Sequence, residues 1–152
     1  MVEQVLCLDT SVIIKYLTLE EPVEEAEQAI ELIHTAQSDT VQLVAPAFAW
    51  AEVGSVLRKK VRTNKLTVSE ADSLWQFFAT LPIDYIDKQL RNRAWEIAHI
   101  YQLPTLYDAA FLASLEVALA PESATREFWT ADRVLLNSLG SARPAYVKEL
   151  GN

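Results

Sequence analysis

Two acidic residues follow apolar segments that are typical of buried β-strands. Asp9 follows Val5–Leu8, a continuous apolar run near the N-terminus, and Asp132 follows the shorter segment Phe128–Thr130. Such runs favour strands that are covered on both faces, as in a parallel sheet. The two carboxylates then lie at the carboxyl ends of strands, the edge at which open α/β sheets bind ligands. The alternative at each position is an ordinary helix N-cap.

Two further acids lie on the apolar sides of predicted helices. Glu52 is four residues after Phe48 and four before Val56, so the three side chains share one helix face. Asp108 shares a face with Phe111, near a helix start, where the helix dipole favours an anion. An acid at the edge of an apolar stripe and a first-turn acid are the ordinary alternatives. A carboxylate that faces a core is costly, however, unless it is paired or bound to a cation.

The four acids are expected to meet at one edge of the sheet, because strand ends and the starts of the following helices lie on the same side. Carboxylates gathered there repel one another unless a cation lies between them. Oxygen ligands without His or Cys suit Mg²⁺ or Mn²⁺ rather than zinc. A Mg²⁺ ion held by carboxylates generates a nucleophilic water and neutralises the charge of a phosphodiester transition state. The predicted reaction is therefore metal-assisted phosphodiester hydrolysis.

Alternating strand and helix patterns predict one domain over residues 1–152. Strands are expected at 5–8, 41–45, 82–86 and 127–130, with an edge strand at 145–147. Helices are expected at 12–17, 22–37, 47–62, 67–81, 87–101, 105–118 and 132–139. This alternation implies βαβ units. The predicted fold class is α/β, a three-layer α/β/α domain with a central, mostly parallel sheet of four to five strands.

Composition and charge restrict the function classes. The net charge of -8 speaks against non-specific nucleic-acid binding but does not exclude a nuclease with an acidic, cation-neutralised site. No apolar segment approaches the roughly 20 residues that span a bilayer, and no signal peptide is evident. The single cysteine, Cys7, has no partner for an internal disulfide. A cytoplasmic protein without a membrane segment is expected.

Four short segments resemble the acidic motifs of PIN domains and, more narrowly, of the VapC toxins of bacterial toxin–antitoxin pairs. They are Leu8–Ser11, Ala51–Val53, Tyr107–Ala110 and Thr130–Arg133, and the resemblance covers essentially the whole chain. It implies a PIN-like fold and a Mg²⁺- or Mn²⁺-dependent endoribonuclease that is often a homodimer. It also implies a cognate antitoxin whose C-terminal segment wraps the groove and keeps the enzyme inactive.

The resemblance assigns roles to individual residues. Asp9 and Asp108 are then the principal metal ligands, while Glu52 and Asp132 complete the acidic site by coordination or by orienting the attacking water. Three hydroxyl residues are expected to hold ligands or the scissile phosphate: Thr10, Ser11 and Thr130.

Two further features have both a functional and a structural interpretation. Five of the 13 basic residues fall within 58–65, where Arg58, Lys59 and Arg62 are expected either to contact RNA or to form a solvated helix end. The aromatic cluster Trp75, Phe77 and Phe78 suggests a dimer interface on the helix predicted over 67–81.

Other function classes compete with this interpretation. A PIN-like module without hydrolytic activity would act through RNA or protein contacts, and an RNA-processing PIN nuclease would need no antitoxin. A phosphatase of the haloacid dehalogenase type needs a second Asp where Ser11 stands. A response-regulator receiver needs its phosphoacceptor Asp on a middle strand and a Lys late in the chain, and neither is evident. Both phosphate-transfer alternatives therefore fit poorly. The RNA target, which includes tRNA among the candidates, and the number of metal ions stay open.

Overall fold

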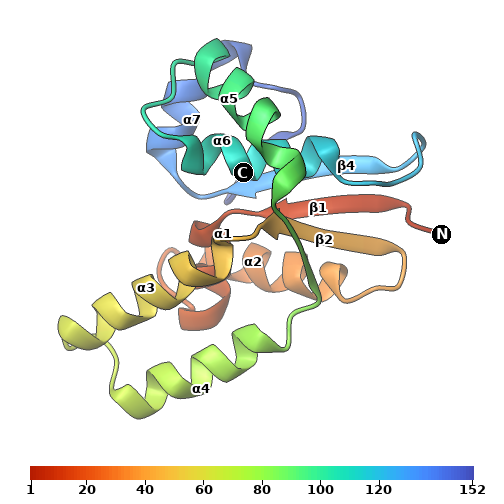
Figure 1. The fold of residues 1–152 in the computed structure, drawn as a ribbon. Coiled ribbons are helices and arrows are strands. Elements are labelled where there is room, and N and C mark those ends of the chain that lie inside the picture. Colours follow the sequence, from red (N-terminus) through yellow and green to blue (C-terminus); the bar gives the residue numbers. More distant parts are fainter.

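A parallel sheet of five strands forms the centre of the computed structural model, which describes all of residues 1–152. The strand order is β3-β2-β1-β4-β5, so β1 is the middle strand (Figure 1). Every neighbouring pair is parallel, in agreement with the predicted fold class. The strands are β1 (Gln4–Leu8), β2 (Val41–Pro46), β3 (Ile83–Ile86), β4 (Thr125–Thr130) and β5 (Val147–Glu149).

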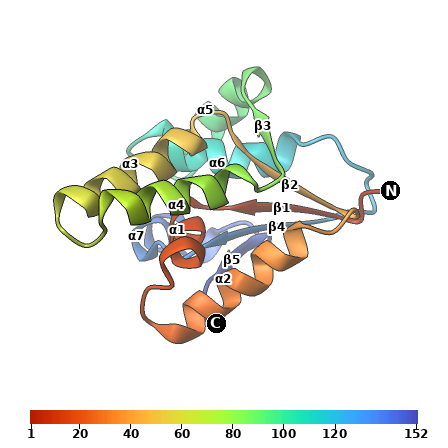
Figure 2. The same ribbon diagram turned by 90° about the horizontal axis from the view of Figure 1, so that it is seen from below.

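Seven α-helices connect and cover these strands. They are α1 (Thr10–Thr18), α2 (Val23–Ala36), α3 (Ala49–Arg62), α4 (Val68–Ala79), α5 (Arg91–Ile100), α6 (Leu106–Val117) and α7 (Arg133–Leu139). Helices α5, α6 and α7 lie on one side of the sheet and α1 to α4 on the other (Figure 1). Helices α3 and α4 lie side by side and extend beyond the sheet, as the view from below also shows (Figure 2).

The alternation of side chains along β1 explains the three layers. Val5 and Cys7 belong to the core under α5, α6 and α7, whereas Leu6 and Leu8 belong to the core under α1 to α4. All four are buried, because the middle strand of a parallel sheet is covered on both faces. The continuous apolar run therefore predicted the position of β1 correctly.

Boundaries differ from the prediction near the predicted helix over 87–101 and the predicted strand over 127–130. The helix begins only at Arg91, because a 3₁₀ turn occupies Lys88–Leu90. Strand β4 begins earlier, at Thr125, because its polar first residues pair in register with β1 from Gln4 onward. Backbone pairing, rather than hydrophobicity, defines this strand's start.

The edge strand and the first helix also have bounds that differ from the prediction. The edge strand predicted at 145–147 is instead Val147–Glu149, because the amide of Val147 first closes a turn on the carbonyl of Pro144. Helix α1 begins at Thr10 rather than at residue 12, so the helix starts directly after Asp9.

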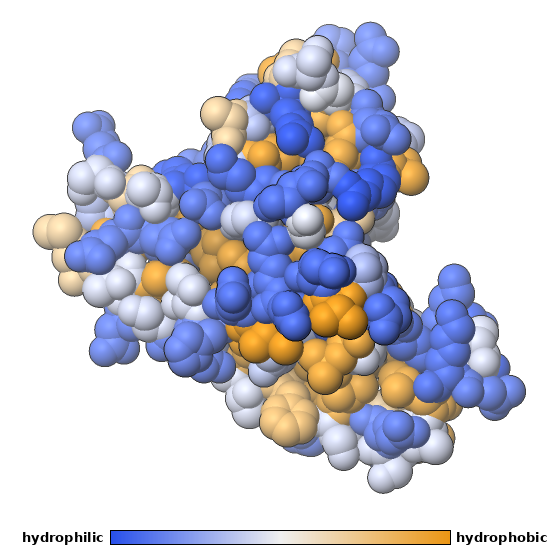
Figure 3. Space-filling model, turned by 180° about the vertical axis from the view of Figure 1, so that it is seen from behind, coloured by the Kyte–Doolittle hydropathy of each residue, from blue (hydrophilic) through white to orange (hydrophobic).

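Apolar and charged side chains alternate over the surface. The side opposite to Figure 1 shows separate hydrophobic patches between charged residues (Figure 3). None of the helices combines the length and the hydropathy that crossing a membrane requires.

The aromatic cluster expected on α4 does not form one exposed surface. Phe78 is 4% exposed and belongs to the core, and the ring of Trp75 lies against Gly54 of α3. Only Phe77 points substantially to solvent, with 60% of its surface exposed. The expectation that these three rings together mark a dimer interface is therefore wrong in its residues.

Substitution of a buried and of an exposed Phe, Phe128 and Phe77, tests the described core. Phe128, in the middle of β4, is fully buried, so Phe128→Ala is expected to lower the free energy of unfolding by about 3–5 kcal/mol. The matched control Phe77→Ala removes an exposed ring and is expected to change it by less than about 0.5 kcal/mol. Urea denaturation followed by circular dichroism measures both. Similar losses in the two variants would contradict the described core.

Candidate metal centre at the carboxyl end of the sheet

Asp9 lies at the end of the middle strand and is only 6% exposed. Its Oδ2 accepts hydrogen bonds from Ser11 Oγ at 2.8 Å and from Thr130 Oγ1 at 2.9 Å. Both hydroxyls therefore hold the same oxygen, while Oδ1 has no side-chain partner. This arrangement fixes the carboxylate and leaves one oxygen for a ligand.

The two hydroxyls are themselves held by backbone amides of the loop after β4. The amide of Ala131 donates to Ser11 Oγ at 3.0 Å, and the amide of Asp132 donates to Thr130 Oγ1 at 3.0 Å. We call Ser11 and Thr130, together with these two amides, the hydroxyl clamp. Because the clamp joins the ends of β1 and β4, the position of Asp9 and that of the loop carrying Asp132 depend on each other.

Glu52 and Asp132 approach the same edge from two helix starts. Thr10 Oγ1 donates to Glu52 Oε2 at 2.7 Å, which connects the first turn of α1 to that of α3. Asp132 caps α7, because its Oδ1 accepts from the amides of Val134 and Leu135 at 2.9 and 3.2 Å. The ordinary N-cap alternative is thus confirmed for Asp132, and it leaves Oδ2 without a protein partner.

Asp108 lies in the first turn of α6 and is partly exposed. Its side chain has no hydrogen bond or salt bridge within the chain. Partial burial, together with the negative charges of Asp9, Asp132 and Glu52, raises the pKa of Asp108 to about 6. The four predicted acids are therefore close enough to repel one another, as the topology predicted.

The same repulsion affects the other carboxyl groups. Burial raises the pKa of Asp9 above its ordinary value, against the opposing hydrogen bonds from Ser11 and Thr130. Partial burial and the charge of Asp9 raise the pKa of Glu52. No Lys or Arg forms a salt bridge with any of the four acids. Even Arg133, the neighbour of Asp132, pairs with Glu25 and Glu149 instead.

The donor set fits a hard divalent cation in its chemistry. All four groups offer carboxylate oxygen, which Mg²⁺ and Mn²⁺ prefer, and their repulsion is of the kind that a bound cation relieves. As the side chains stand, no three His, Cys, Asp or Glu groups are close enough to hold one ion. Binding therefore requires the carboxylates to turn inward. Asp9 is fixed by its hydrogen bonds, whereas the carboxylate of Asp108, which has none, is the least restrained of the four.

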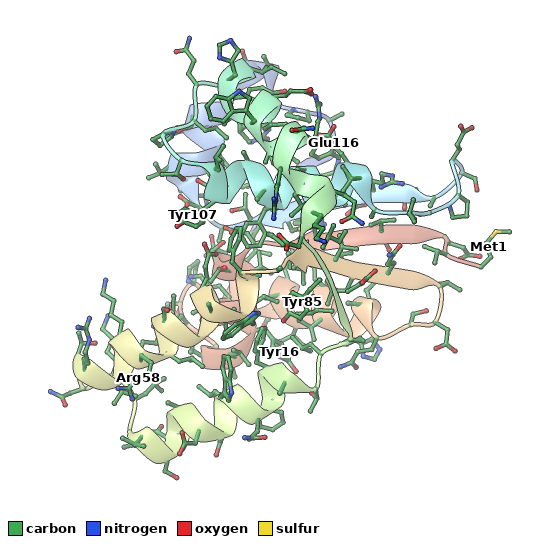
Figure 4. The ribbon with its side chains drawn as sticks, viewed as in Figure 1. Met1, Tyr16, Arg58, Tyr85, Tyr107 and Glu116 are labelled. Atoms are coloured by element: carbon green, nitrogen blue, oxygen red, sulfur yellow. The ribbon has the colours of Figure 1, made fainter.

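The predicted RNA contacts lie away from these acids. Arg58, Lys59 and Arg62 follow Glu52 by six to ten residues along α3, which is about 9–15 Å. Arg58 lines a groove of about 420 Å³ between α3 and α4 (Figure 4). The structure thus brings the four acids and three hydroxyl residues together, but not the three cations.

Sequence reasoning missed the aromatic residues that border the acidic site. Tyr107 is 59% exposed, and its ring meets that of Phe48 edge-on with centroids 5.2 Å apart. Tyr107 directly precedes Asp108 in the sequence and Phe48 stands four residues before Glu52, but the contact joins α6 to the start of α3. No helical or strand spacing within one segment indicates such a contact.

Removing one hydroxyl of the clamp tests its role. Thr130→Val keeps the shape but removes the donor to Asp9 and the acceptor for the amide of Asp132. Because these groups are buried, the free energy of unfolding is expected to fall by about 1–3 kcal/mol. The control Thr125→Val, at the exposed start of β4, is expected to change it by less than about 0.5 kcal/mol. Urea titrations without metal compare the two, and equal stability of both variants would refute the clamp.

The raised pKa of Asp108 predicts how stability depends on pH when divalent cations are removed. The folded carboxyl, with a pKa of about 6, holds its proton more tightly than an unfolded one at 3.8. The stabilisation from this proton is complete below 3.8 and is lost as the pH rises through about 6. In EDTA, the melting temperature of Asp108→Asn is therefore expected to rise relative to that of the unsubstituted chain as the pH increases from 4.5 to 7.5. A constant difference between the two melting temperatures would contradict this prediction.

Comparisons with known proteins agree with the fold. The chain resembles a toxin–antitoxin complex component from Klebsiella pneumoniae, with 18% identity, a TM-score of 0.59, and coverage of 94% of this chain and 95% of that one. It also resembles a chain of VapBC2 from Rickettsia felis bound to a DNA fragment from its promoter, with 12% identity, a TM-score of 0.57, and coverage of 96% and 98%. At these identities the similarity shows a common fold.

The sequence comparisons are more specific about the family. No curated protein matches the chain. The PIN domain family, however, matches residues 6–134, a range that includes all four acids. PIN domains are generally nucleases that use divalent metals. The chain belongs to the PIN domain family.

Proposed function

We propose that the protein is a Mg²⁺- or Mn²⁺-dependent endoribonuclease of the VapC type, the toxin of a toxin–antitoxin pair. The observation that carries the proposal is the convergence of four carboxylates that no cation of the chain neutralises. Carboxylates whose pKa values are raised by burial and by one another are found mainly at functional sites, because the chemistry there needs them close together.

The hydrogen bonds of each carboxylate indicate its role in the proposed reaction. Asp9 and Asp108 hold the metal ion, Asp9 through the oxygen that the hydroxyl clamp leaves free. When bound, the ion supplies a nucleophilic water and neutralises phosphate charge. Glu52 is held by Thr10 and accepts a proton from the attacking water or orients it. Asp132 contributes its second oxygen, since capping α7 occupies the first.

Partners follow from the same proposal. RNA is the substrate, with tRNA and other structured RNA as candidates, and Arg58, Lys59 and Arg62 are proposed to contact its backbone away from the cleaved bond. The similar structures from Klebsiella pneumoniae and Rickettsia felis are described as toxin–antitoxin and VapBC complexes, which supports a cognate antitoxin for this chain. We also propose a homodimer in the cytoplasm, although not through the aromatic cluster of α4.

Cleavage of a panel of tRNA and single-stranded RNA tests the proposal. With Mg²⁺ or Mn²⁺ the purified protein is expected to cut at least one RNA, and EDTA is expected to stop the reaction. Asp9→Asn and Asp108→Asn are each expected to lower the rate by at least about 100-fold, because each removes a charge that holds the cation. The control Asp39→Asn changes an exposed acid before β2, at the opposite end of the sheet, and is expected to keep full activity.

Two results would contradict the enzyme. Equal activity of Asp9→Asn and the control would place hydrolysis elsewhere. The absence of metal binding in calorimetry, together with no cleavage of any RNA of the panel, would favour the alternative of a PIN-like binding module. An RNA-processing nuclease without antitoxin would cut RNA in the same way. A small antitoxin gene next to the gene of this protein would identify the toxin, and its absence would favour the RNA-processing nuclease.

A further inference from the structure

A pocket of about 490 Å³ opens beside the acidic site, where the starts of α3, α5 and α6 meet. We call it the aromatic pocket and define it by Phe48, Arg91, Asn92, Trp95 and Tyr107, which line it. Figure 4 shows Tyr107 at the start of α6, beside the end of the sheet where the acids lie. None of these five residues belongs to the predicted metal centre.

The aromatic pocket and the acidic site share two chain segments. Tyr107 directly precedes Asp108 in the first turn of α6. Phe48 is the N-cap residue of α3 and stands one turn before Glu52. Because the edge-on contact between the two rings joins these segments, the pocket and the two carboxylates have a fixed relation.

The aromatic surfaces of the pocket are open. Trp95 is 68% exposed and Tyr107 is 59% exposed, so both rings offer a face to a planar ligand. Unpaired nucleobases bind proteins mainly by stacking on such rings. A base stacked on Tyr107 would lie at the start of α6, the helix whose first turn carries Asp108.

The polar groups of the pocket suit the remainder of a nucleotide. Arg91 and Asn92 form no side-chain hydrogen bond and no salt bridge within the chain. In a protein of net charge -8, an exposed guanidinium without an ion pair attracts a phosphate. The amide of Asn92 offers both a donor and an acceptor to a base edge. Asp87, also in the lining, offers an acceptor only.

We propose that the aromatic pocket binds an unpaired nucleobase of the RNA, next to the phosphodiester bond that the acidic site cleaves. This inference rests on the proposed function and adds a determinant of its specificity. RNA in which the flanking base is unpaired and accessible is then the preferred substrate. A second copy of the chain is the competing occupant of these rings, but it explains neither the uncommitted Arg91 and Asn92 nor the proximity to Asp108.

Paired changes in protein and RNA test the pocket. Once a cut site is known, substrates are made with an abasic nucleotide at each position flanking the bond. At one position, the abasic change and Tyr107→Ala are each expected to reduce kcat/KM about tenfold or more, and together no further than either alone. Tyr107→Phe, which restores the ring, is expected to recover most of the loss. Ile100→Ala, an exposed change at the far end of α5, serves as control.

The outcomes separate this inference from the proposed function. Cleavage by the unsubstituted protein together with full activity of Tyr107→Ala would overturn the pocket and leave the nuclease intact. Losses from the two changes that multiply at every position would also overturn it, since the ring and the base would then act independently. A variant that loses activity only because it changes from dimer to monomer, as judged by light scattering, would assign the rings to a second copy.

Discussion

The structure depends on the way in which Asp9 is held at the end of its most buried strand. A carboxylate in that position is costly, and two hydroxyl donors on a single oxygen offset part of the cost. Each hydroxyl is in turn fixed by a backbone amide of the loop between β4 and α7. The clamp thus connects two neighbouring strands at the edge where ligands bind. It also leaves one carboxylate oxygen free, which is what a metal ligand requires.

The other acids reach the same place because of topology rather than local sequence. A parallel sheet puts the carboxyl ends of β1 and β4 beside each other, and the starts of α1, α3, α6 and α7 around them. Partial burial and the resulting repulsion together raise the pKa of Asp108. The basic side chains of the protein form their salt bridges with other acids; Arg133, for example, pairs with Glu25 and Glu149. In the proposed function, an external cation supplies the missing positive charge at this edge.

Much of the fold and of the acidic set was predictable from particular residues. The apolar run before Asp9 identified the middle strand, and helical spacing placed Glu52 and Asp108 on inward faces. Polar Thr125 and Arg126 concealed the start of β4, since backbone pairing determines it. The cluster on α4 misled because Phe78 and Phe77 are adjacent and so point in different directions. The donors of the clamp and the ring contact of Phe48 with Tyr107 join distant segments, which spacing within one segment cannot reveal.

Crystals grown or soaked with Mn²⁺ at pH 7.5 would test the central claim most directly, through the anomalous signal of the ion. The expected result is one strong peak between Asp9 Oδ1 and the carboxylate of Asp108, with Glu52 and Asp132 turned toward it directly or through water. The bonds from Ser11 and Thr130 to Asp9 Oδ2 should be unchanged. A peak elsewhere, or none at saturating Mn²⁺, would contradict the assignment of this edge as a metal centre.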